Sequence, residues 1–227
     1  MNFLRNRYPD PSRLFLSALG MMFLGGAEIA NCAVIDLFAE SPQTLALDAN
    51  TRHLSESVAL ASSSFSSRQT SLYGAGQSVA ISTLANEVDY SFPISGAAVG
   101  QFSLTYTSSQ SANLVKNGET GILLCFENVQ LASSATITVG YYSTQWKGST
   151  QVSLTGAEGD EEVFVPFSAF QNSKPGDFAK VTSLSVTTKN LQPGDRFSMG
   201  AITSIPEVSS PALLALAAVC VAGKRRR

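Results

Sequence analysis

The sequence predicts an all-β protein, an antiparallel β-sandwich or jelly roll, with an apolar segment at each end of the chain. Two observations carry this prediction. Charged residues make up only 14% of the 227 residues, well below the roughly 25% typical of soluble domains. Between residues 34 and 204, short runs alternate apolar and polar side chains with a period of two, and no long run has the 3.6-residue period of an amphipathic helix. We therefore expect one β domain in this body.

The N-terminal segment, residues 1–33, has the organisation of a secretory signal peptide. A basic stretch ending at Arg13 precedes the uncharged run 14–26, and small residues follow up to Ala33. The run is too short for a helix of ~20 apolar residues that spans a bilayer. We expect a signal helix that signal peptidase removes. A buried helix of a cytosolic fold and a lipoprotein signal ending at Cys32 are the alternatives.

The body of the chain, residues 34–204, reads as short strands separated by turns. In residues 101–107, the side chains of Phe102, Leu104 and Tyr106 share one face. Similar alternation occurs in residues 79–82, 136–142, 152–154, 163–165 and 184–186. Residues 122–126 (ILLCF) are apolar on both sides, as expected of a central strand. Glycine- and proline-containing turns separate these runs, so about ten short strands are predicted, as in a sandwich or jelly roll.

The C-terminal segment, residues 205–227, has three parts. Pro206, Glu207, Val208 and Ser209 lead into an apolar run that ends at Gly223. The chain then closes with the cations Lys224, Arg225, Arg226 and Arg227. The positive-inside rule places these cations in the cytoplasm and the body on the opposite side of the membrane. The segment from Val208 to Gly223 is ~24 Å long as a helix, which is shorter than the ~30 Å hydrocarbon core and suits a temporary anchor.

This three-part tail resembles the PEP-CTERM sorting signal of Gram-negative bacteria, which has a Pro-Glu-Pro motif, a hydrophobic helix and an Arg-rich end. Pro206 and Glu207 match the first two motif positions, and Val208 departs from the second proline. The resemblance implies two processing partners, signal peptidase and an exosortase-like protease. It also implies a transient stay in the inner membrane and a final place at the cell surface or outside the cell, with exopolysaccharide as a further partner. An ordinary C-terminal membrane anchor is the alternative.

Parts of the body are similar to exosortase-sorted jelly-roll proteins. Residues 34–38 resemble their first strand, and residues 66–70 resemble their Gly-Gly-Glu-Arg-Asp segment, of which only Arg68 is kept. Residues 164–170, followed by 178–181, are similar to their late strand and the turn after it. These motifs are shared with carbohydrate-binding-like jelly rolls. The resemblance implies a fold and a destination, and it implies no activity.

The distribution of charge argues against nucleic acid as a partner. The whole chain has a net charge of −2, but the basic residues gather at its two ends. The body between them holds eight basic and fourteen acidic residues, so its net charge is about −6. An acidic body repels a phosphate backbone, whereas neutral polymers and cations are tolerated.

Three sets of residues are candidates for catalysis, and we predict that none of them is catalytic. Cys125 lies in the apolar run 122–126 and reads as a buried structural thiol, because a nucleophile needs a paired base. His53 is the single histidine, so a Ser-His-Asp triad would have to include it; its polar surroundings indicate a surface residue. Glu87 and Asp89 share one face of a strand, either as exposed charges on an edge strand or as the carboxylate pair of a glycosidase.

An acidic run is the strongest metal candidate. It consists of Glu158, Asp160, Glu161 and Glu162. The run offers oxygen ligands to calcium but lacks the spacing of an EF-hand, so we expect a solvated acidic loop. By analogy with related jelly rolls, Asp36, Glu40 and Asp195 are weaker calcium candidates. We predict no cofactor and no metal site, with calcium as the open alternative.

Two exposed aromatic side chains are the candidates for sugar contact. Tyr142 is expected to point away from the core side of its strand, and Trp146 is expected near a turn. An exposed aromatic ring stacks on the apolar face of a sugar; the alternative is that Trp146 closes one end of the core. The sequence thus predicts an exported, non-catalytic surface or matrix protein. The alternatives are a carbohydrate-binding module that uses Trp146 and Tyr142, and a secreted polysaccharide hydrolase or lyase.

Overall fold

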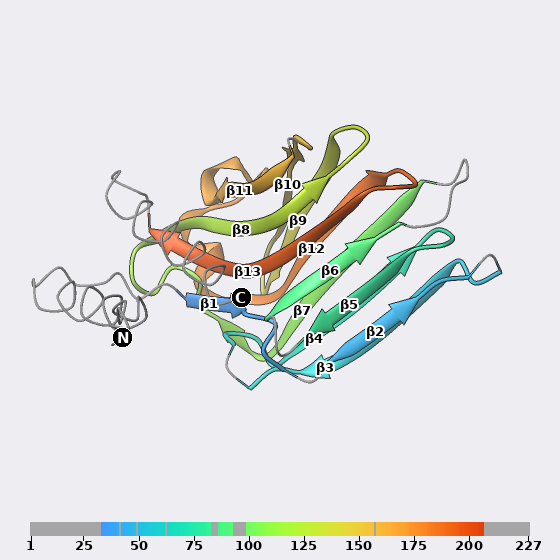
Figure 1. The fold of residues 1–227 in the computed structure, drawn as a ribbon. Coiled ribbons are helices and arrows are strands. Elements are labelled where there is room, and N and C mark those ends of the chain that lie inside the picture. Colours follow the sequence, from blue (N-terminus) through green and yellow to red (C-terminus); the bar gives the residue numbers. More distant parts are fainter. Residues whose placement is uncertain are drawn as a thin grey trace, which may run out of the picture. The chain divides into compact units, whose positions relative to one another are not determined.

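Two antiparallel β-sheets, packed face to face, make up the described part of the chain (Figure 1). The computed structural model describes residues 33–206 except 41, 49, 62, 83–85, 93–98 and 157. It confirms the all-β, jelly-roll-like fold. The predicted signal helix and sorting helix lie outside the described residues. Within those residues, none of the helical segments has the length and apolar character needed to cross a membrane.

The first sheet, sheet A, contains seven strands. Their order is β11 (Gly159–Pro166), β8 (Glu119–Gln130), β13 (Arg196–Pro206), β6 (Glu87–Ser91), β5 (Ser78–Ser82) and β2 (Gln43–Ala46), and the short β1 (Ala33–Asp36) pairs with β13. The apolar run 122–126 lies in β8, between β11 and β13, as the prediction of a central strand required.

The second sheet, sheet B, contains six strands. Their order is β10 (Lys147–Leu154), β9 (Ala135–Ser143), β12 (Val181–Leu191), β7 (Gly100–Ala112), β4 (Ser67–Tyr73) and β3 (His53–Ala59). Two short 3-10 helices, η1 (Phe167–Ala169) and η2 (Pro175–Ala179), connect β11 of sheet A to β12 of sheet B. The edge strands of sheet B are therefore β10 and β3.

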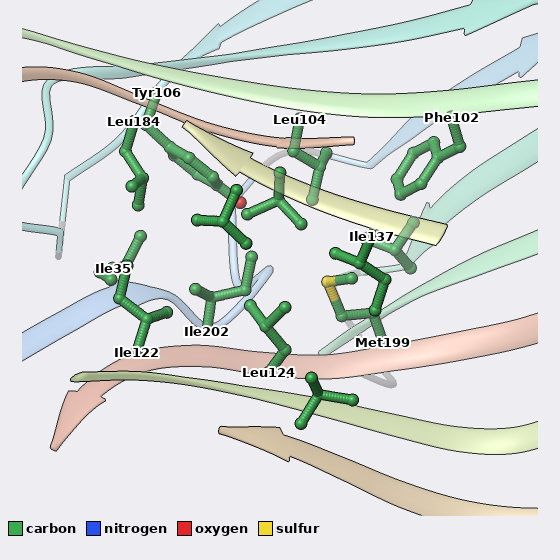
Figure 2. Close-up of a cluster of buried hydrophobic side chains, with 14 of the residues drawn as sticks. Ile35, Phe102, Leu104, Tyr106, Ile122, Leu124, Ile137, Leu184, Met199 and Ile202 are labelled. Atoms are coloured by element: carbon green, nitrogen blue, oxygen red, sulfur yellow. The ribbon is translucent and has the colours of Figure 1, made fainter. Parts of the chain in front are cut away.

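The core lies between the two sheets and is built by alternation. Phe102, Leu104 and Tyr106 of β7 are all buried, which confirms that they share the inward face. Figure 2 shows them pointing toward Ile202 of β13 and Leu124 of β8 in the opposite sheet. Burial of each such side chain contributes about 1.5–3 kcal/mol, and this drives the two sheets together.

A buried ion pair also joins the two sheets. Arg68 lies on the inward face of β4, and its guanidinium contacts the carboxylate of Asp36 in β1 at 2.6 Å, with exposed fractions of 0% and 1%. Asp36 also accepts hydrogen bonds from the hydroxyl of Tyr106 and the backbone N–H of Phe38. Gln43 of β2 accepts a second bond from Arg68. Arg68 thus fixes the first strand against sheet B.

Strand β13 departs from the predicted domain limit. It continues to Pro206, two residues beyond the expected end at residue 204, and Pro206 pairs with Glu119 of β8. The first motif residue therefore belongs to sheet A. Strand β13 also pairs with β1 in antiparallel fashion, with Ala33 opposite Ser204. The two ends of the described chain consequently leave the sandwich side by side.

Candidate functional site

The outer face of sheet B is covered by short polar side chains. Because strand residues alternate, each inward core residue of this sheet has an outward neighbour, and the outward neighbours are mainly Ser and Thr. We name this surface the hydroxyl face. Its central residues are Ser71 of β4, Ser103 and Thr105 of β7, Ser185 and Thr187 of β12, and Thr138 of β9.

Hydrogen bonds between strands hold this surface in place. The hydroxyl groups of Ser103 and Thr187 are 2.9 Å apart, and those of Ser67 and Thr107 are 2.6 Å apart. Ser185 donates to the carbonyl of Gly140 in the neighbouring strand. Small side chains that bond to each other in this way lie low on the sheet. The result is a broad polar surface on which a flat ligand can rest.

The β9–β10 hairpin, at one corner of sheet B, carries the two predicted aromatic residues. Tyr142 is the last outward residue of β9 before the turn, and its partner across the β9–β10 hairpin is Lys147, the residue after Trp146. Tyr142 is 55% exposed and Trp146 is 45% exposed. Trp146 therefore does not close the core. The backbone N–H and carbonyl of Trp146 both bond to Ser143, which fixes the turn.

A lysine lies over the indole ring of Trp146. The Nζ atom of Lys174 is 5.3 Å from the ring centroid, within the range of a cation–π contact. Asp177 of η2 holds this segment, because its carboxylate accepts bonds from the backbone N–H of Lys174 and the hydroxyl of Tyr141. Burial, followed by the charge of Asp177, raises the pKa of Tyr141 to about 12. The Trp146 corner is thus supported from below and carries positive charge.

The diagonally opposite corner of the hydroxyl face holds a third exposed aromatic residue, Tyr73, which was not predicted from the sequence. Tyr73 of β4 is 40% exposed, and the ring of His53 from β3 stacks on it, with centroids 4.3 Å apart and planes inclined by 13°. Beside Tyr73 is a hollow of about 240 Å³, which Gln101 of β7 and Lys189 and Asn190 of β12 also line. This site could be found only from the register of β4, β7 and β12, and a single sequence does not reveal how strands pair.

The structure places the catalytic candidates apart from one another. Cys125 is buried in β8, as predicted for a structural thiol. His53 is exposed on β3, and its ring is engaged with Tyr73. Glu87 and Asp89 do share one strand, β6. That strand pairs with β13 on one side and β5 on the other, so the prediction of an edge strand was wrong.

Asp89 does line a hollow, on the outer face of sheet A. The hollow measures about 410 Å³ and also contains Arg196, Ser198 and Gln130. Asp89 accepts a hydrogen bond of 2.5 Å from Ser198, and Arg196 donates one of 2.7 Å to Gln130. Among the described residues that line it, Asp89 is the one carboxylate, whereas glycoside hydrolysis requires two carboxyl groups that flank the scissile bond. Its residues therefore lack the pair that the hydrolase interpretation requires.

Most of the acidic run lies in a strand and not in the expected loop; only Glu158 precedes it. Asp160, Glu161 and Glu162 belong to β11, the edge strand of sheet A. Glu161 accepts bonds from the backbone N–H and the hydroxyl of Thr155, and Asp160 accepts one from the N–H of Asn128. These carboxylates accept hydrogen bonds from backbone N–H groups at one end of the sheet. Consecutive acidic residues usually indicate a loop, but here the segment pairs with β8 and forms a strand.

Two of the three weaker calcium candidates have structural partners, whereas the third, Glu40, has a buried carboxylate oxygen without a hydrogen-bond partner among the described residues. The Asp36 carboxylate is bound to Arg68, and Asp195 accepts bonds from the backbone N–H groups of Ala132 and Gln192. In the part of the chain that the structure describes, no group of three or more His, Cys, Asp or Glu side chains is arranged to hold a metal ion. The structure brings together neither the acidic run nor these three residues as a ligand set.

Comparisons with known proteins return weak structural likenesses. No family model and no curated protein matches the chain. The family 11 carbohydrate-binding module of the cellulase Lic26A-Cel5E of Clostridium thermocellum has a TM-score of 0.40 at 13% identity, over 80% of this chain and 98% of the module. The agarase AgWH50C has a TM-score of 0.41 at 7% identity, over 60% of this chain and 24% of the agarase. TM-scores and sequence identities this low assign neither a family nor a ligand to this chain.

Proposed function

We propose that the domain binds a polysaccharide on its hydroxyl face and performs no catalysis. The observation that carries the proposal is the exposure of Trp146 and Tyr142 together in the β9–β10 hairpin, at one corner of sheet B. An aromatic ring that is partly exposed but fixed in its turn can stack on the apolar face of a sugar without much loss of side-chain freedom.

The rest of the face suits a long, hydroxylated ligand. Its serine and threonine side chains are both donors and acceptors, as are sugar hydroxyl groups. Along β12, the outward positions from Ser183 to Lys189 span about 20 Å at 3.3 Å per residue. A polymer laid across the face can therefore contact several side chains at once, and many weak contacts add to useful affinity.

The single tryptophan makes this proposal directly measurable. Trp146 is the only tryptophan in the chain, so the intrinsic tryptophan emission reports on this corner alone. We expect that a bound polysaccharide shifts the emission to the blue and protects the indole from acrylamide quenching. Laminarin, galactan, xylan and polygalacturonate would be titrated in turn. If the emission and the quenching of Trp146 stay unchanged with all four polymers, the aromatic corner takes no part in binding; if affinity electrophoresis also detects no binding, the proposal is wrong.

Variants test the same corner without fluorescence. Affinity electrophoresis in gels that contain the bound polymer would compare Trp146→Ala and Tyr142→Ala with the unmodified protein, and we expect each to weaken binding about tenfold. The matched control is Phe164→Ala, because Phe164 is 37% exposed on β11 in sheet A and lies off the hydroxyl face. Equal losses in all three variants would indicate a general effect on folding.

We also propose that the domain is exported and that its C-terminal segment, residues 205–227, is a sorting signal. The pairing of Ala33 with Ser204 supports this, because both flanking segments begin at the same place on the sandwich and can reach one membrane together. The resemblance of Pro206 and the terminal cations to the PEP-CTERM signal supports the exosortase-like route and the final place at the cell surface.

Removal of residues 207–227 tests the sorting proposal. Because β13 ends at Pro206, this deletion leaves every described strand intact, so we expect an unchanged thermal unfolding temperature and loss of the protein from the inner membrane fraction. Replacement of Arg225, Arg226 and Arg227 by Ser should block maturation, which intact mass would show as a retained tail. A truncated protein that remains in the membrane fraction would contradict the proposal.

A further inference from the structure

The hollow beside Tyr73 is a built cavity with an aromatic wall and a cationic wall. Tyr73 of β4 and Lys189 of β12 face each other across Gln101 of β7, because these three residues are register partners in adjacent strands. The two walls are thus separated by two strand spacings, which is about 10 Å. His53 stacks on Tyr73 from β3, the strand on the other side of Tyr73, and is not among the residues that line the hollow.

A buried glutamine supports the end wall of this hollow. Gly74 and Gly100 form the wall, and a Cβ atom on either would lie within 3 Å of the side chain of Gln77. Gln77 is 1% exposed, donates to the backbone carbonyl of Tyr73 and accepts from the hydroxyl of Tyr90. The position of Tyr73 is therefore fixed from behind by Gln77 and from the side by His53.

The charge of the hydroxyl face is opposite to that of the body. None of the outward-facing residues on the six strands of sheet B, as the structure describes them, is Asp or Glu, whereas Lys189 and Lys147 are present at opposite corners. Lys174 adds a third cation above Trp146. The body as a whole has a net charge of about −6. A locally cationic surface attracts anionic ligands, whereas the acidic remainder of the protein repels them.

We infer that the hollow beside Tyr73 binds a carboxylated sugar unit and that the polysaccharide of the hydroxyl face is an acidic one. The inference rests on the proposed function and names its ligand class. The sugar ring stacks on Tyr73, and its carboxylate accepts a charge-assisted hydrogen bond from Lys189. Gln101 and Asn190 supply amide donors and acceptors for the hydroxyl groups. The far end of the same polymer reaches the Trp146 corner, where Lys174 and Lys147 meet a second anionic unit.

The experiment compares polymers that differ in the carboxylate alone. Polygalacturonate and alginate would each be measured by affinity electrophoresis beside its carboxyl-reduced form, which keeps the linkage and loses the charge. We expect the protein to bind at least one polyuronate about tenfold more tightly than the reduced polymer. Added sodium chloride should weaken the binding of the charged polymer more than that of the neutral one.

Three variants separate charge from stacking. Lys189→Gln should remove most of the preference for the charged polymer and leave the affinity for the reduced polymer unchanged. Tyr73→Leu should weaken binding of both polymers by a similar factor, because stacking does not depend on the carboxylate. Lys116→Gln is the matched control, since Lys116 is an exposed lysine in the connection from β7 to β8, away from this hollow. It should behave like the unmodified protein.

The outcomes distinguish the inference from the proposed function. Equal affinity for charged and reduced polymers, or a preference that survives Lys189→Gln, overturns the inference and leaves polysaccharide binding in place. Binding of a polyuronate that depends on Lys189 but leaves the quenching of Trp146 unchanged supports the hollow and overturns the role of the Trp146 corner. Failure of every polymer to bind overturns both.

Discussion

Replacement of Arg68 by methionine is expected to lower the free energy of unfolding by about 3–5 kcal/mol. Methionine fills much of the volume of arginine but provides no charge, so the carboxylate of Asp36, which is 1% exposed, is left without its cation. The hydroxyl of Tyr106 and the N–H of Phe38 remain as its hydrogen-bond donors. Two neutral donors do not replace a guanidinium group for a buried carboxylate.

The loss should depend on pH. Burial raises the pKa of Asp36 above its usual value of 3.8, and the guanidinium of Arg68 counteracts that shift. Without Arg68, the pKa of Asp36 rises further. A carboxyl whose folded-state pKa is raised contributes stability that is present below the unfolded pKa and is lost as the pH rises through the folded pKa. The variant should therefore be closest to the unmodified protein below pH 3.8 and fall behind as the pH increases.

Urea unfolding at several pH values measures this effect, and a second variant controls for it. Asp36→Asn combined with Arg68→Met removes both charges, so the double variant should be more stable than Arg68→Met alone and should not show its pH dependence. Lys116→Met removes an exposed cation and should change the free energy of unfolding by less than about 0.5 kcal/mol. A pH-independent loss in Arg68→Met would mean that Asp36 is not left charged.

Sequence patterns predicted the strands whose two faces differ in polarity. The alternation of Phe102, Leu104 and Tyr106 placed β7 correctly, because one face meets the core and the other meets solvent. Strand β3 gave no such signal, since its residues His53–Ala59 form an edge strand that is exposed on almost every position. A strand that buries little has no need for apolar alternation, so its polar sequence reads as a loop.

The order of the strands within each sheet also could not be predicted from the sequence. Strand β12 lies between β7 and β9, so its partners come from distant parts of the chain. This order aligns Tyr73, Gln101 and Lys189 in one row. Alternation tells which side of a strand a residue occupies, but not which strand is next to it. The Trp146 corner was predictable because its residues belong to one hairpin, whereas the hollow beside Tyr73 needs three strands.

Replacement of Phe178 by alanine is expected to be the other severe change, with a loss of about 3–5 kcal/mol in the free energy of unfolding. Phe178 of η2 is fully buried, and its ring contacts Phe167 at 4.0 Å, Tyr141 at 4.5 Å and Phe170 at 5.3 Å between centroids. Two of these rings come from η1 and its C-cap and the third from β9, and they cannot all move into the space it leaves, so a cavity remains and its lining loses contact.

The site gives this variant a second, independent readout. The ring of Phe178 anchors the segment that carries Lys174, and Lys174 lies over Trp146. We therefore expect Phe178→Ala to lower the midpoint of thermal unfolding by roughly 6–20 °C and, in the protein that remains folded, to increase the acrylamide quenching of Trp146. Phe164→Ala is the control, because Phe164 is 37% exposed on sheet A; it should lower stability by about 1 kcal/mol and leave the quenching unchanged. If Phe178→Ala destabilises the fold without any change at Trp146, then η2 does not position the aromatic corner, and the hairpin turn alone holds it.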